Sequence, residues 1–311
     1  MLKRFFLRLL FAALAAAILW GFVTYPIEIF MPTVYETERL PTILSVTPTV
    51  PVITPPPAED PQRSVDESAP VTETERGDIL GLMYHDLTLD PTAVTPWTTT
   101  PDRLRQNIES LLSLGYLPLS IEDYVDGNYS LTQDYFIVTF DDGYLSNLTL
   151  ALPVLRSLGV KAAVFVITES VWASNHMSWQ QLREARATGV LSLYSHTHTH
   201  KSARSSLRDP FLADVRRSQE ELTRNLGNSR RRILAYPGGA YTQATMQSLY
   251  REGWDLFVMQ DKPAWYDAET DGKILLRVNV SGEDVDMTKI ANYSRARAGL
   301  SKIGEKTGEN P

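Results

Sequence analysis

From Gly77 onward, short apolar runs alternate with longer stretches in which apolar residues recur every three or four positions. The short runs are typical of buried strands and the longer stretches of amphipathic helices. Alternation of this kind predicts a parallel sheet, and over residues 77–300 a (β/α) barrel is its natural closure. The strands are expected at 79–84, 136–138, 161–168, 190–194, 233–236, 256–259 and 274–280, and the helices at 102–114, 148–158, 179–188, 207–226, 243–252 and 286–298.

The N-terminus has a different pattern. Residues 9–27 carry no charge and are mostly Leu, Ala, Ile, Phe and Val, with Lys3, Arg4 and Arg8 before them and Glu28 after them. A run of this length is long enough to cross a bilayer, and basic residues on its N-terminal side place that side in the cytoplasm. Residues 1–31 are therefore predicted to be a single-pass signal anchor that leaves the rest of the chain outside the cytoplasm. The alternative is a cleaved signal peptide and a secreted protein, since residues 13–15 have the small-residue spacing of a cleavage site.

Between the anchor and the barrel, residues 32–76 hold nine of the chain's 19 prolines, mixed with Thr, Val and Glu. Such a composition cannot bury a core and favours extended polyproline II, so this segment is predicted to be a disordered spacer. The tail at 301–311 is also expected to be disordered.

The net charge and the absence of cysteine exclude several classes of binding site and catalytic chemistry. The formal net charge is -7, and no block of Lys or Arg follows the first few residues, which argues against nucleic-acid binding. The chain has no cysteine, so disulfides, thiol nucleophiles and zinc–thiolate sites are excluded. Any metal must be held by histidines and carboxylates.

Two adjacent acids, Asp141 and Asp142, come at the end of the apolar run 136–138. They repel each other, and burial disfavours their charged forms, so a bound cation would stabilise them. The chain supplies further ligands in His196 and His200, because a spacing of four in a tight turn or first helical turn puts both rings on one side. His198 then points elsewhere. Carboxylate plus two imidazoles suits Zn²⁺ or a similar divalent ion, whereas the alternative is a solvated His-rich loop.

Taken together, the sequence Thr-Phe-Asp-Asp-Gly at 139–143 and His-Thr-His-Thr-His at 196–200 resembles the polysaccharide deacetylase (NodB-homology) family, carbohydrate esterase family 4. The resemblance covers roughly residues 78–280. It implies a distorted (β/α) barrel and metal-dependent removal of acetyl groups. By similarity, Asp141 is the general base, and Asp142, His196 and His200 are the metal ligands.

Two departures from the family pattern stand out. The family usually carries an Arg before its Pro-Tyr/Phe-Gly motif to steady the base, but residues 235–239 read Ala-Tyr-Pro-Gly-Gly. By resemblance this stretch, Tyr236, Pro237 and Gly238, faces the substrate, and a backbone N–H near Gly238 binds the oxyanion. The usual late histidine that serves as general acid is also absent, since no His follows position 200.

In its place His85 ends an early Met-Tyr-His. This pattern resembles the branch of the family that deacetylates poly-N-acetylglucosamine, in which the barrel strands are circularly permuted. His85 is therefore the candidate general acid. The alternative is a strand-end histidine that only packs against the barrel. His176 has no motif around it.

These observations predict a hydrolase that removes N-acetyl groups from N-acetylglucosamine units of a polysaccharide. Peptidoglycan, chitin oligomers or O-acetylated xylan are alternative substrates within the same chemistry. A catalytically inactive glycan-binding module is the rival of another class, and the missing Arg favours it. Trp172, Trp265 and Tyr266 lie in predicted loops where they could contact sugar, whereas Trp254 is assigned to the core.

Overall fold

The computed structural model describes residues 76–204, 206–260, 274–282 and 285–303. The predicted anchor at 1–31, the spacer up to residue 75, the end of the tail from residue 304, and both Trp265 and Tyr266 lie outside these ranges. Within them, no helix combines the length and the apolar character that crossing a bilayer requires.

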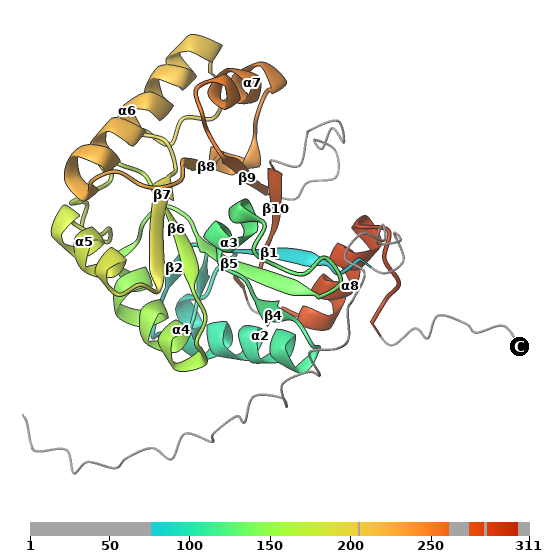
Figure 1. The fold of residues 1–311 in the computed structure, drawn as a ribbon. Helices are drawn as coiled ribbons and strands as arrows, with labels where there is room; N and C mark the ends of the chain where they lie inside the picture. The colour runs from blue at the N-terminus through green and yellow to red at the C-terminus, as the bar shows by residue number, and fades with distance from the viewer. Residues whose placement is uncertain (1–75, 205, 261–273, 283–284, 304–311) are drawn as a thin grey trace, which may run out of the picture. The chain divides into compact units, whose positions relative to one another are not determined.

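The predicted parallel barrel is confirmed. Its sheet closes on itself because β1 pairs with β10 on one side and with β5 on the other, always in parallel. Around the closed sheet, the strands follow the order of the chain, and Figure 1 shows helices α2, α4, α5, α6 and α7 arranged around them. The barrel strands are β1 (Ile79–Tyr84), β5 (Tyr135–Phe140), β6 (Ala162–Val166), β7 (Leu191–Ser195), β8 (Ile233–Ala235), β9 (Leu256–Gln260) and β10 (Ile274–Asn279).

The helices begin and end near the predicted residues because the sequence contains recognisable capping residues at their ends. Ser178 and Gln181 form a capping box at the start of α5, and Gly159 ends α4 in the left-handed conformation. The helices of the barrel are α2 (Pro101–Ser113), α4 (Leu152–Leu158), α5 (Trp179–Ala187), α6 (Arg208–Leu226), α7 (Gln243–Arg251) and α8 (Met287–Arg297), with a π-turn, η3 (Asn147–Ala151), leading into α4.

Several short elements of the described residues are not predicted by the sequence pattern. Helix α3 (Ile121–Asp126) has only six residues, although Ser120 caps its start and Gly127 ends it at φ 74°. Strand β4 (Leu117–Pro118) pairs with the start of β5, and β2 (Asp86–Leu87) pairs with β3 (Thr98–Thr99) in a separate small sheet. Elements this short carry too few residues for a periodic pattern to reveal them.

The core has an inner and an outer part, and strand alternation assigns residues to each. On β5, Phe136, Val138 and Phe140 pack outward with residues of the surrounding helices. Ile137 belongs to the inner cluster, with residues such as Phe165 of β6. Each such side chain contributes roughly 1.5–3 kcal/mol when it is fully buried. The next inward-facing positions after Ile137 are Thr139 and Asp141. The same alternation therefore places the Asp141 carboxylate inside the barrel, at the carboxyl end of β5.

Candidate active site

The two adjacent acids diverge because the chain turns sharply after β5. Asp142 adopts φ 72° and Gly143 φ 85°, a left-handed pair that a non-glycine residue rarely enters. Asp141 continues the strand, and its N–H donates to the carbonyl of Tyr84 at 2.9 Å. Asp141 is 3% exposed, while the Asp142 side chain retains 15% exposure. The two carboxylates therefore have different surroundings despite being neighbours in sequence.

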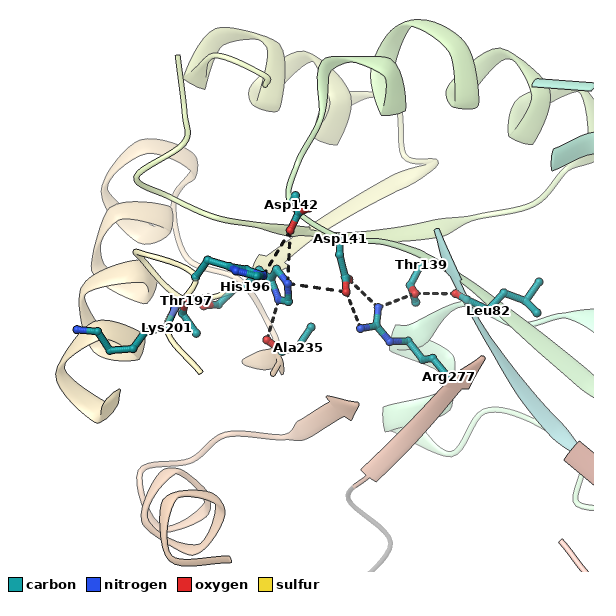
Figure 2. Close-up of polar contacts among 11 residues, drawn as sticks. Leu82, Thr139, Asp141, Asp142, His196, Thr197, Lys201, Ala235 and Arg277 are labelled. Atoms are coloured by element: carbon teal, nitrogen blue, oxygen red, sulfur yellow. Dashed lines mark hydrogen bonds and ion pairs between the residues drawn. The ribbon is translucent and has the colours of Figure 1, made fainter. Parts of the chain in front are cut away.

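Both oxygens of Asp141 are occupied by Arg277 of β10. The guanidinium donates to Oδ1 at 2.7 Å and to Oδ2 at 2.8 Å, a bidentate pair shown in Figure 2. It also donates to Thr139 Oγ1 at 2.8 Å, and that hydroxyl donates to the carbonyl of Leu82 at 2.7 Å. The guanidinium carbon lies 5.3 Å from the Phe165 ring centroid. Sequence reasoning left open what steadies Asp141, and the structure supplies this arginine.

Burial by itself would raise the pKa of Asp141, but Arg277 and the nearby imidazole of His196 together hold that pKa well below its usual range. Asp141 is therefore a carboxylate at neutral pH. A fully buried charge of this kind is tolerated because its counter-charge is equally buried, with Arg277 at 0% exposure.

Gly81 of β1 makes room for this arginine. A Cβ at position 81 would lie 2.5 Å from the carbonyl oxygen of Leu276 and 3.0 Å from Cγ of Arg277. The first of these distances is shorter than any ordinary contact, and the atom it meets is backbone. A larger residue at position 81 would therefore separate β1 from β10 or displace Arg277.

His196 follows β7 and is held in one tautomer. Its Nδ1 lies 2.9 Å from the carbonyl oxygen of Ala235, so Nδ1 carries the proton and Nε2 presents a lone pair. Burial lowers the pKa of His196 to about 4, which leaves the ring neutral at pH 7. A neutral imidazole with a free Nε2 is the form that binds a metal ion.

His200 reaches the same place from a turn and not from a helix. Thr197 and His200 adopt φ 67° and 55°, which bends residues 196–200 back on themselves. His200 Nε2 lies 3.8 Å from Asp142 Oδ1, and His196 Nε2 lies 3.6 Å from the same oxygen. The rings of the two histidines are 5.0 Å apart, centroid to centroid. The predicted convergence of both rings on Asp142 is what the structure shows.

The donor set fits a divalent cation. One ligand atom from each of Asp142, His196 and His200 lies within 4.8 Å of the others. Asp142 Oδ1 is buried, and no described residue gives it a hydrogen bond. Burial and the neighbouring charge of Asp141 raise the pKa of Asp142 to about 7, so a cation at this point would stabilise its carboxylate. Asp142, with its free oxygen, can act as a ligand, whereas Asp141 has both oxygens engaged.

The turn that carries the histidines is pinned by Asp214 of α6. Asp214 Oδ2 accepts from the N–H groups of His198 and Thr199, both at 3.0 Å, and Oδ1 accepts from the Thr199 hydroxyl at 2.8 Å. Lys201 Nζ lies 3.9 Å from Oδ1. Asp214 is buried, at 7% exposure. One carboxylate therefore fixes the backbone between the two candidate ligands.

We expect Asp214→Asn to weaken metal binding by about 10–100-fold, the usual cost of losing a group that orients metal ligands. The amide would present a donor to the Thr199 hydroxyl or to a backbone N–H, so the turn would loosen. The measurement is a competition titration of Zn²⁺ against a chromophoric chelator. Asp209→Asn, an exposed residue in the first turn of the same helix, is the control and should bind as wild type. Equal affinity in both variants would contradict the role of Asp214.

His85 lies next to this group. It directly follows Tyr84, whose carbonyl accepts from Asp141, and its own carbonyl accepts from Asn147 Nδ2 at 2.8 Å. Its ring packs edge-on to Trp97 with 4.9 Å between centroids. Burial lowers the pKa of His85, partly opposed by the charge of Asp141. His85 is thus close enough to Asp141 for their charges to interact, and its role as general acid stays a prediction.

The other two histidines lie outside the candidate metal group. His198 is buried, with Nδ1 2.9 Å from Thr168 Oγ1, which agrees with the expectation that it points away from the ligands. His176 pairs with Asn175 through Nδ1 at 2.8 Å, and its ring packs against that of Tyr144 at a 30° tilt with 4.6 Å between centroids.

The stretch predicted to face the substrate is only partly placed to do so. The Tyr236 ring is 1% exposed and stacks on Phe211 with 5.6 Å between centroids, and its N–H donates to the carbonyl of Val258 at 2.9 Å. Pro237 is also buried. Of the three predicted residues, Gly238 is the exposed one, at φ 64°. Tyr236 therefore belongs to the outer core, where strand alternation places the residue after inward-facing Ala235.

Comparisons with known proteins point to one family. Residues 128–256 match the family model for polysaccharide deacetylase. Over 210 residues the chain is 27% identical to YxkH of Bacillus subtilis, which is named as a polysaccharide deacetylase, and this covers 65% of the chain and 72% of that protein. Over 146 residues it is 27% identical to the poly-β-1,6-N-acetyl-D-glucosamine N-deacetylase of Staphylococcus epidermidis, covering 42% and 50%. The solved structure of IcaB from Ammonifex degensii superposes with a TM-score of 0.58 and 25% identity, over 70% of this chain and 98% of that one.

Proposed function

We propose that the chain, which matches the family model for polysaccharide deacetylase over residues 128–256, removes N-acetyl groups from N-acetylglucosamine units of a cell-surface or cell-wall polysaccharide by hydrolysis of the amide bond. The observation that carries the proposal is the division of labour between the adjacent acids. Asp141 is held as a carboxylate by Arg277, while Asp142 Oδ1 has no hydrogen bond and lies 3.6 and 3.8 Å from Nε2 of His196 and His200. The name of the Staphylococcus epidermidis relative favours a β-1,6-linked polymer as substrate.

Asp142, His196 and His200 would hold the metal, and Zn²⁺ fits two nitrogen donors and one carboxylate with positions left open. When bound, the ion supplies Lewis acidity, which polarises the acetyl carbonyl and makes water easier to deprotonate. The residues of the chain then handle the protons. Asp141 accepts the proton of the attacking water, and Arg277 keeps its carboxylate oriented for that transfer.

Attack of the water on the acetyl carbon forms a tetrahedral species, and the C–N bond then breaks to give acetate and a free amine. An exposed backbone at Gly238 is available to donate to the developing oxyanion. His85 gives the departing amine its proton. Burial lowers the pKa of His85, but negative charge that develops beside the ring during the reaction favours the imidazolium, so the acid form is available when it is needed.

The inactive-module alternative loses its main support. That alternative drew on the missing Arg before Pro237, and the described residues contain a different arginine, Arg277, that grips Asp141 through two bonds. A glycan-binding module would have no use for a buried carboxylate held in its ionised form next to a candidate metal group.

We further propose that the enzyme is anchored in the cell membrane by residues 1–31 and works outside the cytoplasm. The support is the uncharged apolar run at 9–27 with basic residues before it. Cleavage of this segment would instead give a secreted enzyme.

The proposed function is tested by acetate release from the purified full-length chain. We expect release from β-1,6-linked N-acetylglucosamine oligomers, abolition of that release by a chelator, and recovery on addition of Zn²⁺. Chitin oligomers, peptidoglycan and acetylated xylan serve as competing substrates in parallel assays. Release from xylan alone would favour an O-acetyl esterase, and a metal-loaded chain that releases acetate from none of the four would contradict the proposal.

A further inference from the structure

Two tryptophans stand exposed on the loops that flank β5. Trp97 is 51% exposed and Trp172 is 70% exposed. Trp97 lies in the segment after β1, and Trp172 in the segment after β6. Because β5 pairs with β1 on one side and with β6 on the other, these segments leave the barrel on opposite sides of the strand that carries Asp141.

The loop of Trp172 is tied to the turn that holds the two acids. At its start, the N–H of Ile167 donates to the carbonyl of Asp142 at 3.3 Å, and at its end the N–H of Met177 donates to the carbonyl of Gly143 at 3.1 Å. Between these anchors, Val171 is buried at 8% exposure while its neighbour Trp172 projects outward. The loop that carries this exposed indole is therefore tied at both ends to the turn that holds Asp142, one of the three candidate metal ligands.

Trp172 is also held in an unfavourable backbone conformation, at φ 80°. A bulky residue in this region is a rare outlier, and such outliers persist where the surroundings enforce them, most often at functional sites. Glycine would be the easier residue there. An exposed indole that needs a strained backbone indicates that the side chain itself is what the position requires.

Trp97 is fixed in a similar way on the other side. Its carbonyl accepts from the N–H of Asp86 at 3.1 Å, and the carbonyl of the preceding Pro96 accepts from Asn279 Nδ2 of β10 at 2.8 Å. One part of the indole packs against the ring of His85, the candidate general acid, and about half of the side chain faces solvent. The indole is thus immobilised beside the reacting groups, with apolar surface left open.

We propose that Trp97 and Trp172 are two sugar-binding platforms, one on each side of the reacting N-acetylglucosamine unit, on which neighbouring pyranose rings of the polysaccharide stack. This inference rests on the proposed function and extends it to the substrate's length. A polymer needs open platforms and not an enclosed pocket. Two cavities of about 230 and 190 Å³ lie elsewhere: one runs along β7 from Gly189, and the other lies at the amino end of β1, and neither is lined by Asp141, Asp142, His196 or His200. Rigid aromatic surfaces give contact area at low entropic cost, which suits a carbohydrate chain.

The test combines binding and turnover in the full-length chain. The Kd of a β-1,6-linked N-acetylglucosamine hexamer is measured by calorimetry in an Asp141→Asn background, so that the hexamer keeps its acetyl groups during the measurement. We expect Trp97→Ala and Trp172→Ala each to raise that Kd roughly tenfold, and the corresponding Phe variants to retain most of the affinity. In the otherwise wild-type enzyme, kcat/KM should rise with oligomer length from dimer to hexamer, and each Ala variant should flatten that rise.

Tyr250→Ala is the matched control, since Tyr250 is an aromatic residue of similar exposure, 50%, near the end of α7. Its hexamer affinity should equal that of the parent. Ala variants that bind the hexamer as tightly as the parent would overturn the platforms, as would a loss of kcat/KM by the same factor on every oligomer length. If the parent neither binds the hexamer nor releases acetate from it, the proposed function fails as well, and that result differs from the platforms failing alone.

Discussion

Arg277→Met is expected to lower the free energy of unfolding by about 3–5 kcal/mol at pH 7, the cost of breaking a buried ion pair by removing one partner. Methionine fills much of the volume but leaves the Asp141 carboxylate at 3% exposure without its two strongest hydrogen bonds. Acetate release should fall at least about a hundredfold, because the base loses the group that keeps it ionised and oriented. Chemical denaturation and an acetate assay measure the two effects.

The choice of pH follows from the direction of the pKa shift. The pKa of Asp141 is lowered in the folded state, so the contribution of the pair to stability is fully present above the unfolded carboxyl pKa of about 3.9 and is lost as the pH falls further. Measurement at pH 7 therefore captures the whole effect.

Two further variants separate the pair from general damage to the core. Arg277→Met combined with Asp141→Asn should be more stable than Arg277→Met alone, since a neutral amide needs no counter-charge. Arg216→Met, which breaks an exposed pair with Glu252, should cost no more than about 1 kcal/mol. If the double variant is simply additive, the buried pair is not what Arg277 contributes.

The barrel and the proximity of the two candidate histidine ligands could be predicted because both follow from local sequence patterns. Strands buried on both faces give short apolar runs, caps mark helix ends, and the spacing of His196 and His200 puts two imidazoles near each other. Arg277 could not be located in this way. Its partner Asp141 is 136 residues away on β5, which is separated from β10 by β1, and local pattern does not say which side chains meet across the interior of a barrel. A signal was nevertheless present, since a lone arginine inside the predicted strand at 274–280 needs a buried counter-charge.

Strand alternation accounts for the placement of Tyr236. Ala235 faces the barrel interior, where its carbonyl accepts from His196, so the next residue along the strand must face outward. Tyr236 does so and packs with Phe211 and Phe257. The contacts of Asp214 could not be predicted from the sequence. They join α6 to a turn in which Thr197 and His200 adopt left-handed conformations, and no glycine in that turn signals such a conformation.

Asp141→Asn is expected to reduce acetate release by about 10²–10⁴-fold, the usual contribution of a general base, while leaving metal binding intact. The amide cannot take a proton from water, but it can still accept one hydrogen bond from Arg277, whose bond to Thr139 Oγ1 is unchanged. The neighbouring variant Asp142→Asn should lose activity for another reason, because it replaces a candidate metal ligand, and excess Zn²⁺ should restore part of its activity.

The measurements that distinguish the two variants are Zn²⁺ stoichiometry, acetate release at increasing Zn²⁺, and circular dichroism to check the fold. Rescue of Asp141→Asn by Zn²⁺ would instead make Asp141 a metal ligand. His196 Nε2 lies 3.8 Å from Asp141 Oδ2 and 3.6 Å from Asp142 Oδ1, so both acids are near enough to share a metal ion with it. What separates them is hydrogen bonding: Arg277 occupies both oxygens of Asp141 and leaves Asp142 Oδ1 open, so the two acids should respond differently to the same substitution.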